Sequence, residues 1–104
     1  MDFNRVRQTG KAYRDARLVL LVRPNGLEVT RFGFITSRRL GKAVVRNRVR
    51  RLLREASRQL CADMAGGFDV VAIATRKAVG SSYHEIRQSL EALARQAGIL
   101  GDGS

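Results

Sequence analysis

The stretch that decides the fold is KAVVRNRVRRLLR, residues 42–54, in which six of the thirteen residues are Lys or Arg. Apolar residues recur through it and beyond it at the spacing of a helix: Val45, Val49, Leu52, Leu53, Ala56 and Leu60. This spacing predicts a helix from about residue 44 to residue 61 or 62, with one apolar stripe that packs on a core. The arginines are left on the other faces of that helix.

These arginines form two groups around the helix. Four of them follow one row at intervals of four residues: Arg46, Arg50, Arg54 and Arg58. Arg48 and Arg51 lie further round the solvent side, and Glu55 is the only acid among them. Like charges at this interval repel by roughly 0.2–0.5 kcal/mol per pair. The arrangement is explained if the partners of the arginines are phosphates of another molecule.

The charge of the whole chain points to the same partner. Its 104 residues contain 20 Lys and Arg against 9 Asp and Glu, a formal net charge of +11. Nine of these cations fall between Arg38 and Arg58, so the charge is concentrated in one region. Such a surplus is self-repulsive and indicates a polyanionic partner. Three of the cations are Lys and the rest are Arg, whose planar guanidinium favours phosphates and base planes.

Length and composition exclude several classes of protein. The chain is long enough for one domain, and its apolar runs of at most five residues are too short to span a membrane. The first ten residues lack the apolar segment of a secretory signal. One cysteine, Cys61, excludes an internal disulfide and fits a reducing compartment. We therefore expect a cytoplasmic protein without a membrane partner.

The remaining elements follow from shorter patterns. Residues 17–22 (RLVLLV) and 27–38 are predicted strands, joined by the turn signal Pro24-Asn25-Gly26 into an antiparallel hairpin. Gly33 in the second strand marks a bulge or a close approach of another group. A third strand over 68–75 follows the basic helix, which predicts a parallel strand–helix–strand unit.

Two further helices complete the order of elements. Residues 2–9 predict a short helix that ends at Gly10. Ser82 and Glu85 have the spacing of a capping box and open a last helix that ends at Gly98. The simplest domain is a sheet with helices packed mainly on one face.

No protein catalytic apparatus is visible. A protein metal nuclease needs a cluster of carboxylates to hold its ions, whereas the acids of this chain are scattered singly. His84 is interpreted as a surface helix residue, and Cys61 as a small half-buried one. We predict no catalytic residue and no metal site in the protein.

The basic run alone leaves several partners open. It fits DNA, double-stranded RNA or ribosomal RNA, and the chain has no zinc-finger spacing, heptad zipper or helix-turn-helix pair. A solvated helix face and a membrane-surface helix are further alternatives. The membrane alternative is weaker because the apolar stripe is needed for the core. A structural RNA-binding protein of ribosomal type and a nonspecific DNA-binding protein stay open.

An ordered set of motifs narrows this choice. RFGFITSRRLGKAVVRNRVRRLLREASR, residues 31–58, contains Ser37-Arg38-Arg39, then Gly-Lys-Ala-Val, then Arg46-Asn47-Arg48 and Arg54-Glu55. This order resembles the signature of the bacterial ribonuclease P protein component. The flanking segments agree with that family, and the similarity covers about residues 2–99.

The resemblance implies both a fold and a function. The fold would be α+β, a two-layer α/β sandwich whose sheet of about four strands contains a left-handed strand–helix–strand crossover. Residues 1–99 would form a single RNA-binding domain, and residues 100–104 a flexible tail. The chain would be the accessory subunit of the ribonucleoprotein endonuclease that removes the 5′ leader from precursor tRNA. The catalytic RNA, with Mg²⁺, would carry the hydrolysis.

Carried over residue by residue, the resemblance also names candidate site residues. Nine positions would contact the catalytic RNA: Arg38, Arg39, Lys42, Arg46, Asn47, Arg48, Arg50, Arg51 and Arg54. Phe3 matches an aromatic that helps to line a cleft for the single-stranded leader, although core packing is an equal alternative for it. Where many members have a second cleft aromatic this chain has Arg7, which is left to contact a leader phosphate or base. Leu21 replaces a further common aromatic.

Overall fold

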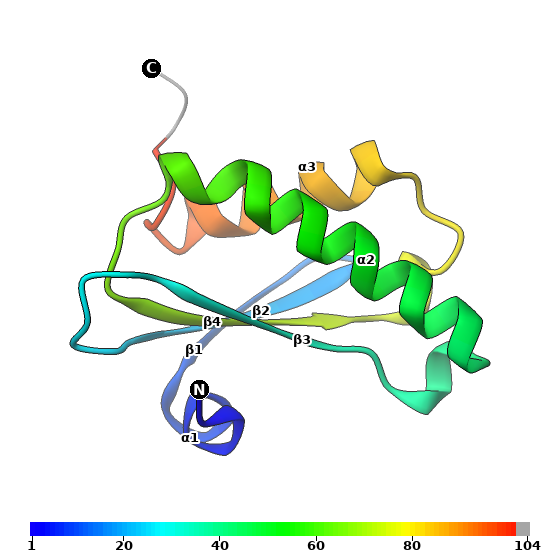
Figure 1. The fold of residues 1–104 in the computed structure, drawn as a ribbon, viewed down its shortest axis with the longest axis horizontal. Coiled ribbons are helices and arrows are strands. Elements are labelled where there is room, and N and C mark those ends of the chain that lie inside the picture. The colour runs from blue at the N-terminus through cyan, green and yellow to red at the C-terminus, as the bar shows by residue number, and fades with distance from the viewer. Residues whose placement is uncertain (102–104) are drawn as a thin grey trace.

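The computed structural model describes residues 1–101 and contains a four-stranded sheet and three α-helices over that range (Figure 1). In chain order the elements are α1 (Phe3–Thr9), β1 (Lys11–Arg14), β2 (Leu18–Pro24), β3 (Arg31–Ile35), α2 (Ala43–Leu60), β4 (Phe68–Ala74) and α3 (Tyr83–Gln96). The predicted helices and the strand at 68–75 are confirmed to within one or two residues. None of the helices in residues 1–101 has both the length and the apolar character that crossing a bilayer requires.

The predicted hairpin is wrong. The strand order is β1-β2-β4-β3, so β4 lies between the two strands that were expected to pair. Asn25 explains the difference, because its side chain accepts from the Leu27 amide and donates to Asp69 at the start of β4. The turn residues therefore hold a wide loop against β4, and β3 begins only at Arg31. β1, which pairs with β2, was not predicted.

The parallel strand–helix–strand unit is confirmed, since β3 and β4 are parallel neighbours joined through α2. In Figure 1 β3 and β4 both run from left to right, β3 lies in front of β4, and α2 passes above them, so a viewer looking along the strands would see the chain turn anticlockwise from β3 over α2 to β4. The crossover is thus left-handed, as the family resemblance implied and against the usual right-handed preference. It places α2 on one face of the sheet.

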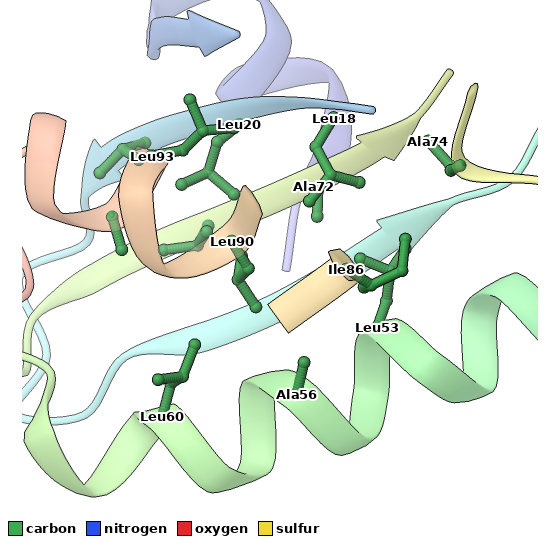
Figure 2. Close-up of a cluster of buried hydrophobic side chains, with 14 of the residues drawn as sticks. Leu18, Leu20, Leu53, Ala56, Leu60, Ala72, Ala74, Ile86, Leu90 and Leu93 are labelled. Atoms are coloured by element: carbon green, nitrogen blue, oxygen red, sulfur yellow. The ribbon is translucent and has the colours of Figure 1, made fainter. Parts of the chain in front are cut away.

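The main core lies between this face and two helices. Figure 2 shows Leu53, Ala56 and Leu60 of α2 and Ile86, Leu90 and Leu93 of α3 pointing toward Leu18, Leu20, Ala72 and Ala74 of the sheet. α3 opens with the predicted capping box, in which Ser82 and Glu85 each accept from the amide of the other. The two helices and the sheet therefore form the expected sandwich.

The third helix, α1, covers the opposite face of the sheet. Val6, which is 1% exposed, packs there with Leu21 and Val71. Gly33 lies directly under α1, and a Cβ atom placed on it would overlap the Phe3 ring. The close approach predicted at Gly33 is confirmed, and the sheet carries one helix on its second face.

The end of the chain differs from the expected tail. Leu100 is 8% exposed and forms a bridge with Met64, and the Gly101 carbonyl accepts from Arg95. Packing therefore continues through residues that were expected to be free. Residues 102–104 lie outside the described part of the chain.

One buried charge holds the loop before β3 in place. The Asp69 carboxylate is 5% exposed and accepts from Nε and Nη2 of Arg31 at 2.8 and 2.9 Å, and from Asn25 Nδ2 at 3.0 Å. The Arg31 hydrogen bonds lower the pKa of Asp69, with further lowering from Asn25. Asp69 thus ties β4 to both the loop and β3.

We predict that Asp69→Asn lowers the free energy of unfolding at pH 7 by about 1.5–3 kcal/mol, the contribution typical of hydrogen bonds to a charged group. The contribution of a carboxyl with a depressed pKa is complete above its unfolded value and is lost as the pH falls through its folded value. The difference between wild type and variant in urea denaturation should accordingly shrink below about pH 4. A difference that is the same at pH 3 and pH 7 would contradict this assignment.

Candidate nucleic-acid interface

The orientation of α2 matches the prediction from its apolar stripe. Val49, Leu53 and Ala56 are fully buried and Leu60 is 3% exposed. Because these residues occupy one side of the helix, most of its arginines are turned away from the sheet. Arg48, Arg51 and Arg54 are exposed, and Arg46 and Arg50 are half-buried.

The loop between β3 and α2 adds three cations to the same region. Its 3₁₀ turn, Arg38–Leu40, is anchored by Leu40, which is 7% exposed. Gly41 then adopts φ +126°, a conformation that side-chain-bearing residues rarely take. Arg38, Arg39 and Lys42 are left exposed next to the first turn of α2.

We refer to the predicted RNA-binding residues as the basic surface. It consists of Arg38, Arg39, Lys42, Arg46, Asn47, Arg48, Arg50, Arg51 and Arg54. The loop and the first three turns of α2 bring all nine residues into one continuous segment of the fold. Their roles in binding remain a prediction.

The eight cations of the basic surface have no acidic partner among residues 1–101. The ion pairs formed there are Arg17–Glu85, Arg31–Asp69, Arg58–Glu55 and Arg95–Glu91. On α2 the acid Glu55 is held by Arg58 at 2.7 Å, and this hydrogen bond lowers the pKa of Glu55. Since Arg58 lies outside the basic surface, that surface keeps its full positive charge.

Neutral groups hold two of these arginines on opposite flanks of α2. Arg50 Nη2 donates to the hydroxyl of Thr36 at 2.7 Å, on the flank next to β3. Arg48 Nη2 donates to the Ser81 carbonyl at 3.4 Å, on the flank next to α3. Neutral acceptors fix the side chains while leaving their charge in place.

Sequence reasoning missed Arg17, which lies close to Arg48. Its Nε donates to the Ser81 hydroxyl at 3.0 Å, and Arg48 donates to the carbonyl of the same Ser81. Arg17 also pairs with Glu85 at 2.6 Å. These residues come from the position before β2, from α2, and from the loop and first turn at the start of α3, so no local spacing could have brought them together. The 72% exposed Val44, in the first turn of α2, was likewise not singled out.

The surface beside α1 contains both candidate leader residues. The Phe3 ring lies against Gly33 and is nevertheless 41% exposed, so it packs on the sheet and keeps part of its surface free. Arg7 is exposed one turn further along α1. Leu21 is 8% exposed beneath the helix and offers little surface to a ligand.

Residues suited to acid–base or metal chemistry do not gather in the described structure. No group of three or more His, Cys, Asp or Glu within residues 1–101 is arranged to hold a metal ion. His84 is exposed in the first turn of α3, as expected. Cys61 is exposed, where a half-buried position was expected, and its thiol donates to the Arg58 carbonyl.

Comparisons with known proteins agree on one family. Residues 1–98 match the family model described as Ribonuclease P. The chain is 43% identical over 100 residues to the ribonuclease P protein component of Chloroflexus aggregans. The aligned region covers 95% of this chain and 74% of that protein. It is 40% identical over 95 residues to the component from Caldanaerobacter subterraneus subsp. tengcongensis, covering 91% and 82%.

Solved structures show the same fold. The RNase P protein of Staphylococcus aureus superposes with a TM-score of 0.87 at 27% identity, covering 96% of this chain and 92% of that one. The RNase P protein from Thermotoga maritima gives a TM-score of 0.83 at 31% identity, with 90% of each chain covered.

The α/β sandwich and these relatives together place the chain in a class of RNA-binding proteins. More specifically, the chain belongs to the ribonuclease P protein family, whose members are subunits of the ribonuclease that processes precursor tRNA. The motifs in residues 31–58 were therefore correctly assigned from the sequence.

We predict that Arg51→Gln and Arg54→Gln change the free energy of unfolding by less than about 0.5 kcal/mol, as is usual for exposed sites. Any change should be a slight stabilisation, because each substitution removes a like-charged neighbour. Urea denaturation measures both variants. Arg31→Gln is the matched control, since the same chemical change removes the partner of Asp69 and should destabilise the fold clearly. Equal destabilisation by all three would show that the basic surface has partners within the protein.

Proposed function

We propose that this chain binds the catalytic RNA of ribonuclease P through the basic surface. The observation that carries the proposal is a set of eight cations, five on α2 and three in the loop before it, that have no acidic partner within residues 1–101, on a helix whose opposite side packs on the core. Phosphates of a folded RNA supply the missing negative charge, and the counterions that they release favour association. Arginine adds bidentate contacts that a compact ammonium group does not make.

The 5′ leader of precursor tRNA is proposed to lie beside α1. The partly exposed ring of Phe3 offers one surface on which a base stacks, and Arg7 offers a cation for a phosphate. Stacking of one base on an aromatic ring contributes roughly 1–3 kcal/mol. With Arg7 and the buried Leu21 in place of further aromatics, this chain relies on a single stacking residue.

In this proposal the RNA, with Mg²⁺, carries the hydrolysis, and the protein acts in the cytoplasm by binding. The acids of the sheet and helices support that division of labour. Glu55, Asp69, Glu85 and Glu91 are each already engaged by an arginine of the same chain. Acids held in this way are not available as a shared cage for catalytic ions.

Reconstitution tests the proposal directly. Wild-type protein is added to the ribonuclease P RNA of the organism that encodes it, and leader cleavage is followed at low Mg²⁺ concentration. We predict faster cleavage and tighter binding of precursor tRNA than with the RNA alone, and a loss of both effects when Arg48, Arg51 and Arg54 are changed to Gln together. Unchanged cleavage and affinity on addition of wild-type protein would instead favour a structural RNA-binding role.

The leader contact has a separate test. Phe3→Ala should weaken the affinity of the reconstituted enzyme for precursor tRNA by about five- to 150-fold, the effect of losing one base stack. Its affinity for mature tRNA, which has no leader, should stay unchanged. Phe3→Leu, which retains apolar packing over Gly33, controls for displacement of α1. Equal losses of affinity for precursor and mature tRNA would show that Phe3 supports only the folded structure and does not contact the leader.

A further inference from the structure

The loop that presents the basic surface is fixed to α2 by one strong side-chain hydrogen bond. β3 ends at Ile35, and Thr36 follows it with 6% of its surface exposed. The Thr36 hydroxyl accepts from Arg50 Nη2 at 2.7 Å, across an interval of 14 residues. The bond thus joins the end of β3 to the second turn of α2.

Arg50 extends this contact to the Arg-Asn-Arg segment. Its Nη1 donates to the side-chain oxygen of Asn47 at 3.4 Å, one turn earlier in α2. A guanidinium group has five N–H donors in a rigid plane. With one donor on Thr36 and one on Asn47, three donors of Arg50 and its full charge stay available to a phosphate.

A long side chain that is already ordered before binding lowers the loss of conformational entropy on binding. An arginine that is free in solution loses its rotamer freedom when it contacts RNA, whereas one that is already held loses less. Arg51 and Arg54 have no comparable hydrogen bond to a neighbouring element within residues 1–101. Arg48 does have one, to the carbonyl of the buried Ser81, but at 3.4 Å it is longer than the 2.7 Å bond of Arg50. Arg50 is therefore the member of the basic surface that is held by the shortest hydrogen bond to a buried partner.

We propose that Thr36 is a positioning residue for RNA binding, because its buried hydroxyl orders Arg50, and through it Asn47, before the RNA arrives. This inference rests on the proposed function of the basic surface. Thr36 itself need not touch RNA, since it is almost fully buried at the end of β3. The partner that benefits is a phosphate of the RNA backbone facing Arg50.

Thr36→Val tests the proposal, because it removes the hydroxyl and keeps the branched shape. Its affinity for the ribonuclease P RNA should fall by about three- to tenfold, the effect of ordering one rotamer-rich side chain during binding. Thr36→Ser, which retains the hydroxyl, should restore most of the affinity.

Double variants separate a positioning role from a general loss of structure. In an Arg50→Gln background, Thr36→Val should cost little further affinity, because the residue that it positions is already gone. In an Arg54→Gln background, Thr36→Val should still lower the RNA affinity by the full three- to tenfold, since Arg54 makes no hydrogen bond to Thr36. Equal losses in both backgrounds would overturn the proposal and make Thr36 a structural residue only.

A measurement without RNA keeps this inference separate from the proposed function. Side-chain NMR of the free protein should show an ordered Arg50 guanidinium in wild type and Thr36→Ser, and a mobile one in Thr36→Val, with Arg54 mobile in all three. An Arg50 side chain as mobile as that of Arg54 in wild type would refute the positioning role, whatever the RNA affinities. Wild-type protein with an ordered Arg50 but no affinity for the RNA would overturn the RNA-binding proposal and, with it, the inference.

Discussion

The burial of one side of α2 against the sheet is the constraint on which the rest of the molecule depends. Val49, Leu53, Ala56 and Leu60 fix the rotation of the helix about its axis, and that rotation decides where every arginine of the helix points. Without this anchor, a helix with so many like charges would be destabilised by its own repulsion. The core therefore supports a charge distribution that no local interaction would favour.

The same constraint explains how the chain keeps its binding surface charged. Each acid that pairs in the described structure pairs with an arginine outside the basic surface: Arg17, Arg31, Arg58 or Arg95. Where the basic surface is held from within, the acceptors are a threonine hydroxyl and a main-chain carbonyl. Neutral acceptors order a guanidinium without cancelling its charge, which suits a surface whose partner is a polyanion.

The features that could be predicted from the sequence are those encoded by residues that lie close together in the chain. The stripe of α2 and the capping box of α3 are local patterns, and both were predicted nearly to the residue. The hairpin failed because a turn signal such as Asn25-Gly26 is local, whereas strand pairing was decided by β4, more than 40 residues further on. β1 was missed because its four residues, KAYR, show no apolar alternation. The left-handed crossover was accessible only through the resemblance to a family.

The candidate site likewise has features that local sequence patterns predicted and contacts that they could not predict. The charge and outward orientation of the basic surface followed from composition and helical spacing. The contacts that order it join residues 14 and 33 positions apart, at Arg50–Thr36 and Arg48–Ser81, and no periodicity in the sequence encodes them. The position of Phe3 falls between the two cases, because Gly33 signalled a close approach without saying which side chain makes it.

Arginine-specific chemical modification, read by mass spectrometry with and without the ribonuclease P RNA, tests the central claim most directly. The account predicts that Arg48, Arg51 and Arg54 react readily in the free protein and become protected when RNA binds, while Arg31 and Arg95 change little. Protection concentrated at Arg31 and Arg95, or unreactive α2 arginines in the free protein, would contradict it.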